Sequence, residues 1–267
     1  MIGFWDCLKR NRKFNRELRA TGCEPRALNF RYPKSQDHTI RLNVFLALAG
    51  LGSRRAVEKL ILQGKVVVNG AIVRNLATRV DSQQDQVLCE DKPVRPHRFQ
   101  YVMLNKPRGY TCTRRDPHAK KTIYELLPQT MKRLAYAGRL DMDSEGLVLL
   151  SNDGNWLNRL AHPRHAVSKV YEVEVKGFPT QRTLGKMCEG IRSKGEWLKA
   201  DTVEILEKHT TSTYLRLTLS EGKNREIRRL LGGLHHPVLH LKRIAIGNLT
   251  LGSLKIGRWR ELLSEEI

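Results

Sequence analysis

Apolar residues recur every three to four positions over 42–49 and again over 54–62. This spacing predicts two amphipathic helices. A glycine-rich break separates them, and Ser53 is a suitable N-cap for the second. The valine-rich run 65–68 predicts a strand, and Asn69-Gly70 is a strong signal for a tight hairpin turn. The pattern therefore predicts a small module of two helices followed by a hairpin.

Beyond residue 100 the apolar runs are short and numerous, and they alternate with a few helical patterns. Such a mixture predicts an α+β domain built on a largely antiparallel sheet. The predicted strands are 101–104, 146–150, 170–175, 203–206, 214–219 and 238–241, and the predicted helices are 122–127, 157–160 and 224–234.

Composition divides the chain into segments. Residues 1–39 form a basic extension with weak periodicity, and residues 91–100 contain two prolines and mixed charge, as linkers do. A small domain is predicted over 40–90 and a larger one over 101–267. The predicted fold class is α+β, with a small N-terminal α/β module followed by a mainly antiparallel-sheet domain.

The chain has Lys+Arg 48 against Asp+Glu 27, a formal net charge of +21. An excess of this size favours a polyanionic partner, because each phosphate that Lys or Arg neutralises releases counterions. Nucleic acid is the favoured partner, and an anionic membrane surface is the weaker alternative. No stretch approaches the roughly 18 consecutive apolar residues of a membrane span, so no membrane-embedded segment is expected.

The five cysteines lie far apart and include no C-x-x-C pair, which favours free thiols in a reducing compartment. The N-terminus lacks the apolar core and cleavage site of a secretory signal. It is basic, as an organelle transit peptide would be, but Asp6 and Glu17 count against one. The expected location is the cytoplasm.

The sequence contains neither a G-x-G-x-x-G run nor a Walker loop, so no nucleotide cofactor is expected. A metal is not expected either, because no carboxylate or thiolate lies at ligand spacing from the clustered histidines. These histidines are His162, His165, His235 and His236.

The densest group of reactive side chains lies in 138–147, where acids alternate with other residues at Asp141, Asp143 and Glu145. Carboxylates in this pattern could hold a hard cation, although calcium-loop spacing is absent. They could also supply a glycosidase-like pair, or a single nucleophilic aspartate beside arginines in an RNA cleft. An acidic hairpin turn without any chemistry is the remaining alternative. The segment alone leaves these alternatives open.

The run GRLDMDSEGLVLL at 138–150 resembles the signature of the pseudouridine synthases, in particular the RsuA/RluB/RluF family of bacterial ribosomal-RNA enzymes. NKPRGY at 105–110, KVY at 169–171 and EGKNREIRRL at 221–230 resemble further family motifs in the same order. Residues 40–90 resemble the S4-like RNA-binding domain, which precedes the catalytic domain in that family. Glu226 departs from the family, which commonly has Gln at that position.

The resemblance implies catalytic roles for Asp141, Tyr171 and Arg228. Asp141 would be the nucleophile, which must be ionised and therefore needs a nearby cation, and Arg228 matches that cation. Tyr171 matches the ring that stacks on the uracil. The implied substrate contacts are Arg139, which could wedge into the RNA stack or contact a phosphate, and Ile227, Lys169 and Arg229. In the S4-like module the implied RNA contacts are Arg54, Arg55, Lys59 and Lys65.

The implied reaction isomerises a uridine of ribosomal RNA to pseudouridine on a flipped-out base, without a cofactor, by a monomeric enzyme. The segment 105–110 is expected to pack beneath the catalytic loop, and Asp143 and Glu145 to brace that loop with its own hydrogen bonds. The runs 112–117 and 122–128 look closer to large-subunit than to small-subunit members. A small-subunit enzyme and a non-catalytic RNA-binding or ribosome-assembly protein are the alternatives.

Overall fold

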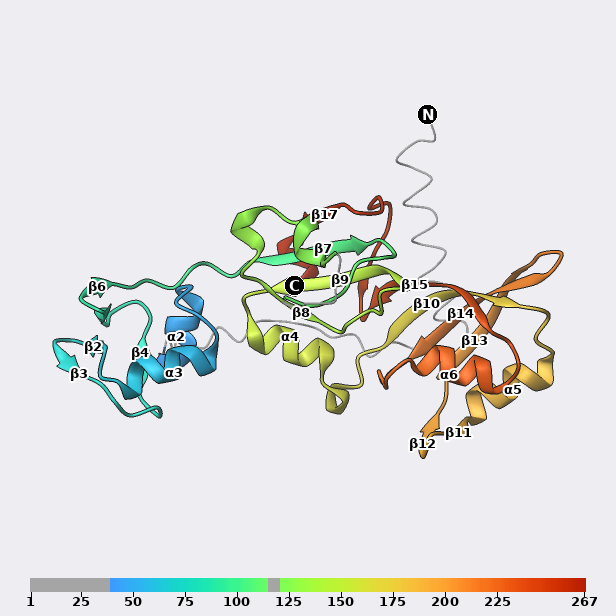
Figure 1. Cartoon of the computed structure of the whole chain (residues 1–267), viewed down its shortest axis with the longest axis horizontal. Coiled ribbons are helices and arrows are strands. Elements are labelled where there is room, and N and C mark those ends of the chain that lie inside the picture. Colours follow the sequence, from blue (N-terminus) through green and yellow to red (C-terminus); the bar gives the residue numbers. More distant parts are fainter. Residues whose placement is uncertain (1–38, 115–120) are drawn as a thin grey trace. The chain divides into compact units, whose positions relative to one another are not determined.

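The computed structural model describes residues 39–114 and 121–267, which form two compact units divided near residue 100 (Figure 1). The basic extension predicted over 1–39 therefore lies outside the described residues, apart from Thr39. Within the described ranges, no helix is long and apolar enough to cross a membrane.

The small unit contains the predicted pair of helices, α2 (Leu42–Leu48) and α3 (Arg54–Leu62). The Ser53 side chain accepts a hydrogen bond from the Ala56 amide, as an N-cap does. Both helices bury their apolar faces in one core around Phe45. The strands are β1 (Thr39–Arg41), β2 (Val66–Val68), β3 (Ala71–Ile72), β4 (Arg79–Asp81), β5 (Val87–Cys89) and β6 (Lys92–Pro93).

Two short sheets complete the small unit, one pairing β1 with β4 and the other ordered β3-β2-β5-β6. Asn69 and Gly70 have φ of 50° and 82°, as the predicted tight turn between β2 and β3 requires. The predicted linker 91–100 needs correcting, because its first half is part of this unit. Strand β6 pairs with β5, and the Val94 amide donates to the Val87 carbonyl.

The large unit is built on a nine-stranded sheet whose main order is β13-β14-β10-β15-β9-β7-β17, with β8 and β16 at its side. The described strands of this sheet pair antiparallel except β9 with β15, which confirms the α+β class. The strands are β7 (Tyr101–Lys106), β8 (Ala135–Ala137), β9 (Glu145–Ser151), β10 (Lys169–Lys176), β13 (Thr202–Lys208), β14 (Ser212–Leu219), β15 (Val238–Ile246), β16 (Leu249–Thr250) and β17 (Trp259–Glu261).

Helices cover the sheet on both faces, so every residue of the central strand β9 is buried. Val148 and Leu150 belong to the larger core, which also contains residues of α5 (Gln181–Glu189) and α6 (Glu226–Gly233). Leu147 and Leu149 belong to a second core with residues of α4 (Gly154–Ala161). The helix predicted over 122–127 is only a short 3-10 turn, η1 (Ile123–Leu126). Similar turns are η2 (Gln129–Met131), η3 (Pro163–His165) and η4 (Ser264–Glu266), and β11 (Ile191–Ser193) pairs with β12 (Glu196–Leu198) as a separate hairpin.

Replacing Gly146 with alanine is expected to destabilise the protein by about 3 kcal/mol or more. Gly146 has φ of 106° and pairs with Arg243 where β9 meets β15. An added Cβ would overlap the Arg243 carbonyl oxygen and lie 2.7 Å from the Arg243 nitrogen. Gly185→Ala is the matched control, because it lies inside α5 with open space around it and should stabilise by about 0.5–1 kcal/mol. Urea unfolding of both variants measures the difference, and equal free energies of unfolding would contradict the prediction.

Candidate active site

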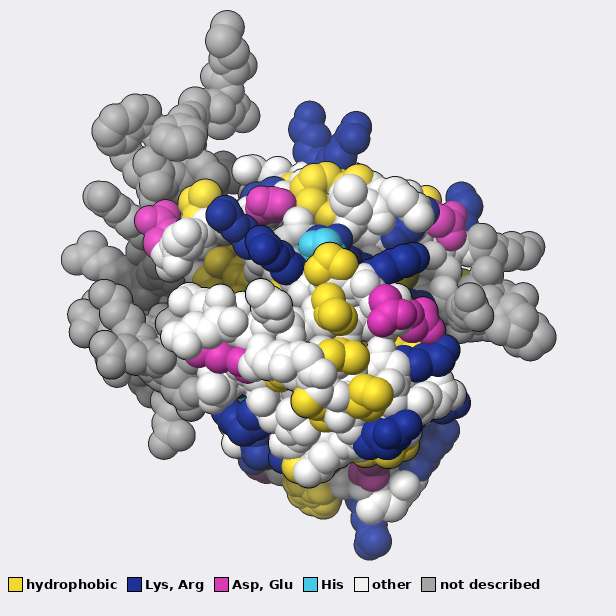
Figure 2. Space-filling view, turned by 90° about the vertical axis from the view of Figure 1, so that its left-hand side faces the viewer, with side chains coloured by type: hydrophobic (Ala, Val, Ile, Leu, Met, Phe, Trp, Pro, Cys, Tyr) yellow, Lys and Arg dark blue, Asp and Glu magenta, His cyan; other side chains and the backbone are white. Residues whose placement is uncertain are grey.

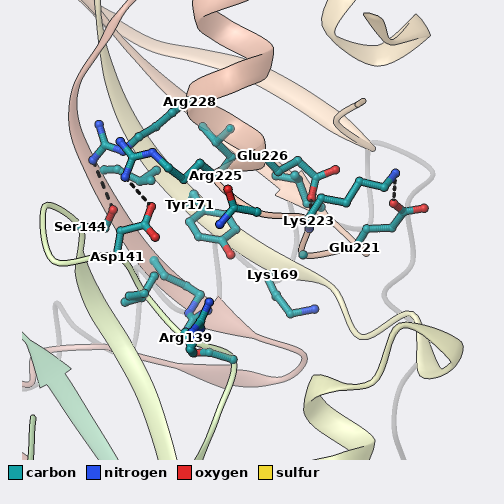
Figure 3. A pocket seen from close by; sticks show the side chains of 18 of the residues that line it. Arg139, Asp141, Ser144, Lys169, Tyr171, Glu221, Lys223, Arg225, Glu226 and Arg228 are labelled. Atoms are coloured by element: carbon teal, nitrogen blue, oxygen red, sulfur yellow. Dashed lines mark hydrogen bonds and ion pairs between the residues drawn. The ribbon is translucent and has the colours of Figure 1, made fainter. Parts of the chain in front are cut away.

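A pocket in the large unit contains the predicted catalytic and substrate residues with the exception of Arg229. It opens between the segment 138–144, the beginning of β10, the loop 221–225 and the first turn of α6 (Figure 3). In this view the Tyr171 ring lies between Asp141 and Lys169. Sequence positions more than 80 residues apart, such as Asp141 and Arg225, therefore meet at one site.

The guanidinium that contacts Asp141 belongs to Arg225, whose Nη1 lies 3.1 Å from the Asp141 Oδ2. The expectation that Arg228 pairs with Asp141 is corrected by this geometry. Arg228 instead lies 3.2 Å from the Asp143 carboxylate and donates to the Asp143 carbonyl at 3.1 Å and to the Ser144 hydroxyl at 3.3 Å. Arg225 contacts the carboxylate of Asp143 as well, at 3.2 Å.

Helix α6 explains why two arginines reach this loop. Ile227 and Leu230 are buried in the core, so they fix which side of the helix faces inward. Arg228 lies in the first turn of α6 and Arg225 immediately before it, so both stand at the same end of the helix. Arg225 itself precedes the helix with φ of 47°, and the signal that could have identified it is its spacing from Arg228.

The segment 138–144 is held by donors from distant strands. The buried Lys106 ammonium donates to the Ser144 carbonyl at 2.6 Å, which confirms that 105–110 packs beneath this loop. The buried Arg243 side chain donates to the carbonyls of Gly138 at 2.7 Å and Leu147 at 2.8 Å. Sequence reasoning missed Arg243, because nothing local indicates that a strand arginine turns inward. These bonds fix the backbone that carries Asp141.

The electrostatics favour the charged form of the Asp143 carboxylate. Burial acts to raise the pKa of Asp143, but the hydrogen bond from Arg225 and the charges of Arg228 and Arg225 outweigh it and lower that pKa. The sequence analysis expects Asp143 to form hydrogen bonds within its own loop. Its carboxylate is instead bound mainly by Arg225 and Arg228. Glu145 likewise lies 3.1 Å from the His240 ring nitrogen on β15.

Strand β10 supplies Tyr171 and Lys169 from one face, because side chains two residues apart point the same way. Tyr171 is 9% exposed and packs in the core that also contains Ile227. The buried Lys169 ammonium donates to the Val167 carbonyl at 2.9 Å. Burial, aided by the charge of Arg243, lowers the pKa of Lys169 to about 8.

Two of the residues that the resemblance implies as substrate contacts, Arg139 and Arg229, lie in different surroundings. Arg139 is exposed at the rim of the pocket, where either of its expected roles is sterically open. Arg229, which the resemblance implies as a substrate contact, does not line the pocket. Its guanidinium binds Glu196 at 2.6 Å and also contacts the Ser193 carbonyl.

The implied RNA-binding residues of the small unit lie on its surface. Arg54, Arg55 and Lys59 are exposed on α3, whereas the Lys65 ammonium lies 2.6 Å from the Glu90 carboxylate. Figure 2 shows one face of the molecule, on which Lys and Arg side chains are more widespread than Asp and Glu. In the residues that the structure describes, no group of three or more His, Cys, Asp or Glu side chains is placed to hold a metal ion.

A pH dependence is expected from Lys169, because its ammonium is charged below about pH 8 and neutral above it. If this charge attracts RNA, the KM for RNA should rise about tenfold between pH 7 and pH 9. Lys169→Arg keeps the charge across this range and should remove the rise. Steady-state kinetics of both proteins at several pH values test this. A wild-type profile identical to that of Lys169→Arg would contradict it.

Comparison with known proteins identifies both units. Residues 100–232 match the family model of RNA pseudouridylate synthases, and residues 40–87 match that of the S4 domain. The chain is 44% identical over 229 residues to an RNA pseudouridine synthase of Aquifex aeolicus, covering 85% of this chain and 92% of the relative.

Two further relatives carry names that specify a ribosomal subunit. The chain is 37% identical to the ribosomal large subunit pseudouridine synthase B of Bacillus subtilis, covering 85% of this chain and 93% of that one. It is 35% identical to the ribosomal small subunit pseudouridine synthase A of Escherichia coli, covering 85% and 98%. A crystal structure of a pseudouridylate synthase, 34% identical, superposes with a TM-score of 0.60 over 85% of this chain and 97% of that one.

Proposed function

Because the chain belongs to the RNA pseudouridylate synthase family and is an isomerase acting on RNA, we propose that it converts one uridine of large-subunit ribosomal RNA to pseudouridine. In this proposal Asp141 is the nucleophile. The observation that carries the proposal is the position of the Asp141 carboxylate, which shares a pocket with Tyr171 and Ile227 and is hydrogen-bonded to Arg225.

The reaction exchanges one bond for another within the nucleotide. The bond between N1 and C1′ breaks, a bond between C5 and C1′ forms, C5 loses its proton and N1 gains one. Asp141 attacks either the sugar carbon or the pyrimidine ring. Arg225 donates a hydrogen bond to its carboxylate and helps to hold it in place. The atoms and electrons balance, so the proposed reaction needs no cofactor.

The target base must leave its helix before this chemistry can begin, at a cost of a few kcal/mol. We assign Tyr171 to stack on the extruded uracil and to help move the proton from C5, and Ile227 to support the base from the opposite side. Both side chains are buried in the core and are therefore rigid enough to define one orientation of the ring. Arg139 at the rim enters the vacated stack or binds a phosphate.

The choice of large-subunit RNA rests on the sequence runs 112–117 and 122–128 and on the relative from Bacillus subtilis. Small-subunit RNA is the alternative, favoured by the relative from Escherichia coli. We further propose that the protein acts as a monomer in the cytoplasm, where bacterial ribosomal RNA is assembled into ribosomes.

Tritium release from transcripts labelled at C5 of uridine tests the proposal, because only substitution at C5 expels the label. Large-subunit and small-subunit transcripts are compared in parallel, and carbodiimide primer extension then locates the pseudouridine. Release from the large-subunit transcript alone supports the proposal. Release from the small-subunit transcript alone overturns the choice of subunit. Binding without release from either would leave an RNA-binding or assembly protein.

Charge reversal in the small unit should weaken RNA binding. Arg54→Glu combined with Arg55→Glu is expected to reduce affinity at least about tenfold and to flatten the slope of log K against log salt by about 0.7–0.9 per lost phosphate contact. Both side chains are exposed on α3, so the fold should persist. Filter binding over a salt series measures both quantities. An unchanged slope and affinity would mean that recognition lies entirely in the catalytic unit.

A further inference from the structure

The hairpin of β11 and β12 lies outside the main sheet but next to the active site. Its turn is formed by Lys194 and Gly195, whose φ values of 50° and 80° suit a two-residue hairpin turn. In Figure 1 the hairpin extends from the body of the large unit, close to α5 and α6. The proposed function assigns no role to this hairpin.

The two faces of this hairpin differ in character. Ser193 and Glu196 form one cross-strand pair, and Arg229 of α6 binds both of them. Arg192 and Trp197 form the next pair, and alternation along the strands places them on the opposite face. One face is thus anchored to the helix that carries Arg228, and the other is presented outward.

Trp197 is 55% exposed although it is one of the largest apolar side chains. Its indole lies against Gly190, where an added Cβ would overlap Nε1 and lie 2.8 Å from Cε2. Its carbonyl accepts a hydrogen bond of 2.7 Å from the Lys223 ammonium, and Lys223 lines the active-site pocket. The ring therefore packs on Gly190, and the backbone that carries it is hydrogen-bonded to a residue of the pocket.

The hairpin and the residue after it carry three exposed cations, Arg192, Lys194 and Lys199. The one carboxylate of the hairpin, Glu196, is paired with Arg229, and the exposed Glu189 lies two residues before the hairpin. Exposed aromatic rings among cations are the usual platform for unpaired bases, because the ring stacks on the base while the cations bind the phosphates beside it.

We propose that the hairpin 191–198 binds the RNA strand next to the target uridine, with Trp197 stacking on one unpaired base. Arg192, Lys194 and Lys199 contact the adjoining phosphates. The hairpin thereby extends the RNA path beyond the pocket and contributes to the selection of sites with an unpaired nucleotide nearby. This inference rests on the proposed function and adds a substrate contact to it.

The test compares full-length wild type with Trp197→Ala, Trp197→Phe and Phe178→Ala on tritium-labelled ribosomal RNA transcripts. Phe178 is the matched control, because it is 51% exposed and follows the end of β10 remote from Lys169. Trp197→Ala should raise KM about 5- to 150-fold, the effect of one lost stacking contact, with kcat within about twofold. Trp197→Phe should retain most of the affinity, and Phe178→Ala should match wild type.

Fluorescence gives a second readout that does not depend on how well Trp197→Ala folds. RNA should quench the tryptophan emission of wild type, and Trp197→Phe should lose most of the quenching while it still binds. Lys194→Gln combined with Lys199→Gln should flatten the salt slope by about 0.7 per contact. The inference is overturned if Trp197→Ala leaves KM unchanged and Trp197→Phe retains the quenching. A hairpin that binds a protein instead of RNA would give this result.

These outcomes are separate from a failure of the proposed function. If wild type released no tritium from any transcript, the proposed reaction would be wrong. The fluorescence comparison would still decide whether the hairpin binds RNA.

Discussion

Replacing Asp141 with asparagine is expected to stop tritium release from uridine-labelled ribosomal RNA, lowering kcat by about 10⁴-fold or more. Asparagine has the size of aspartate and still accepts the hydrogen bond that Arg225 donates at 3.1 Å, so the loop keeps its shape. It cannot attack the nucleotide, because the amide is neutral and a poor nucleophile. RNA affinity should stay within about threefold, since one charge among many changes.

Asp143→Asn is the matched control for this experiment, because Asp143 lies two residues away and contacts the same arginines. Its backbone carbonyl still accepts the hydrogen bond from Arg228, so we expect a loss of only about 10- to 100-fold. Single-turnover kinetics separate chemistry from binding. Activity of Asp141→Asn above a few per cent, together with an inactive Asp143→Asn, would move the nucleophile to Asp143.

The two helices and the β2–β3 hairpin of the small unit could be predicted from its sequence, because their signals are local. Ser53 caps the helix that follows it, and Asn69-Gly70 adopts the positive φ values that its turn requires. Each of these signals acts within a few residues. The strands β1, β4, β5 and β6 were not predicted, and β6 lies in the predicted linker, where Lys92 pairs with Cys89 across a turn that composition does not reveal.

The large unit was less predictable, because its arrangement depends on contacts between distant residues. Helix α5 was missed because its apolar stripe is short, with only Leu184 and Met187 buried, and Gly185 weakens the helical signal. The hairpin 191–198 was also missed because of a weak local signal, since its turn residues Lys194 and Gly195 are not a typical hairpin-turn pair.

At the candidate active site, sequence motifs indicated side chains that share one pocket, but not the partners of those side chains. Asp141, Tyr171 and Ile227 line one pocket, as the resemblance implied. Which arginine touches which carboxylate depends on long flexible side chains that compete for the same oxygens. Arg225 and Arg228 both stand at the N-terminal end of α6, and both contact the Asp143 carboxylate. That choice is made by the packing of α6, which no local pattern encodes.

Removing Arg228 is expected to reduce kcat more than removing Arg225, although it is Arg225 that donates to the Asp141 carboxylate. Arg228→Met should lower kcat about 10³-fold. The Arg228 side chain is 13% exposed and supports the loop through the Asp143 carboxylate, the Asp143 carbonyl and the Ser144 hydroxyl. Without it Asp143 relies on Arg225, which is drawn away from Asp141, so the nucleophile loses its cation and its position together.

Arg225→Met should lower kcat only about 10- to 100-fold, because it removes one charge-assisted hydrogen bond from a side chain that is 44% exposed to water. Arg182→Met controls for the loss of one cation, since Arg182 is exposed in the first turn of α5 and should leave kcat unchanged. Tritium release at saturating RNA ranks the three variants, and thermal melting verifies that each is folded. A larger loss in Arg225→Met than in Arg228→Met would show that direct contact with Asp141 matters more than support of its loop.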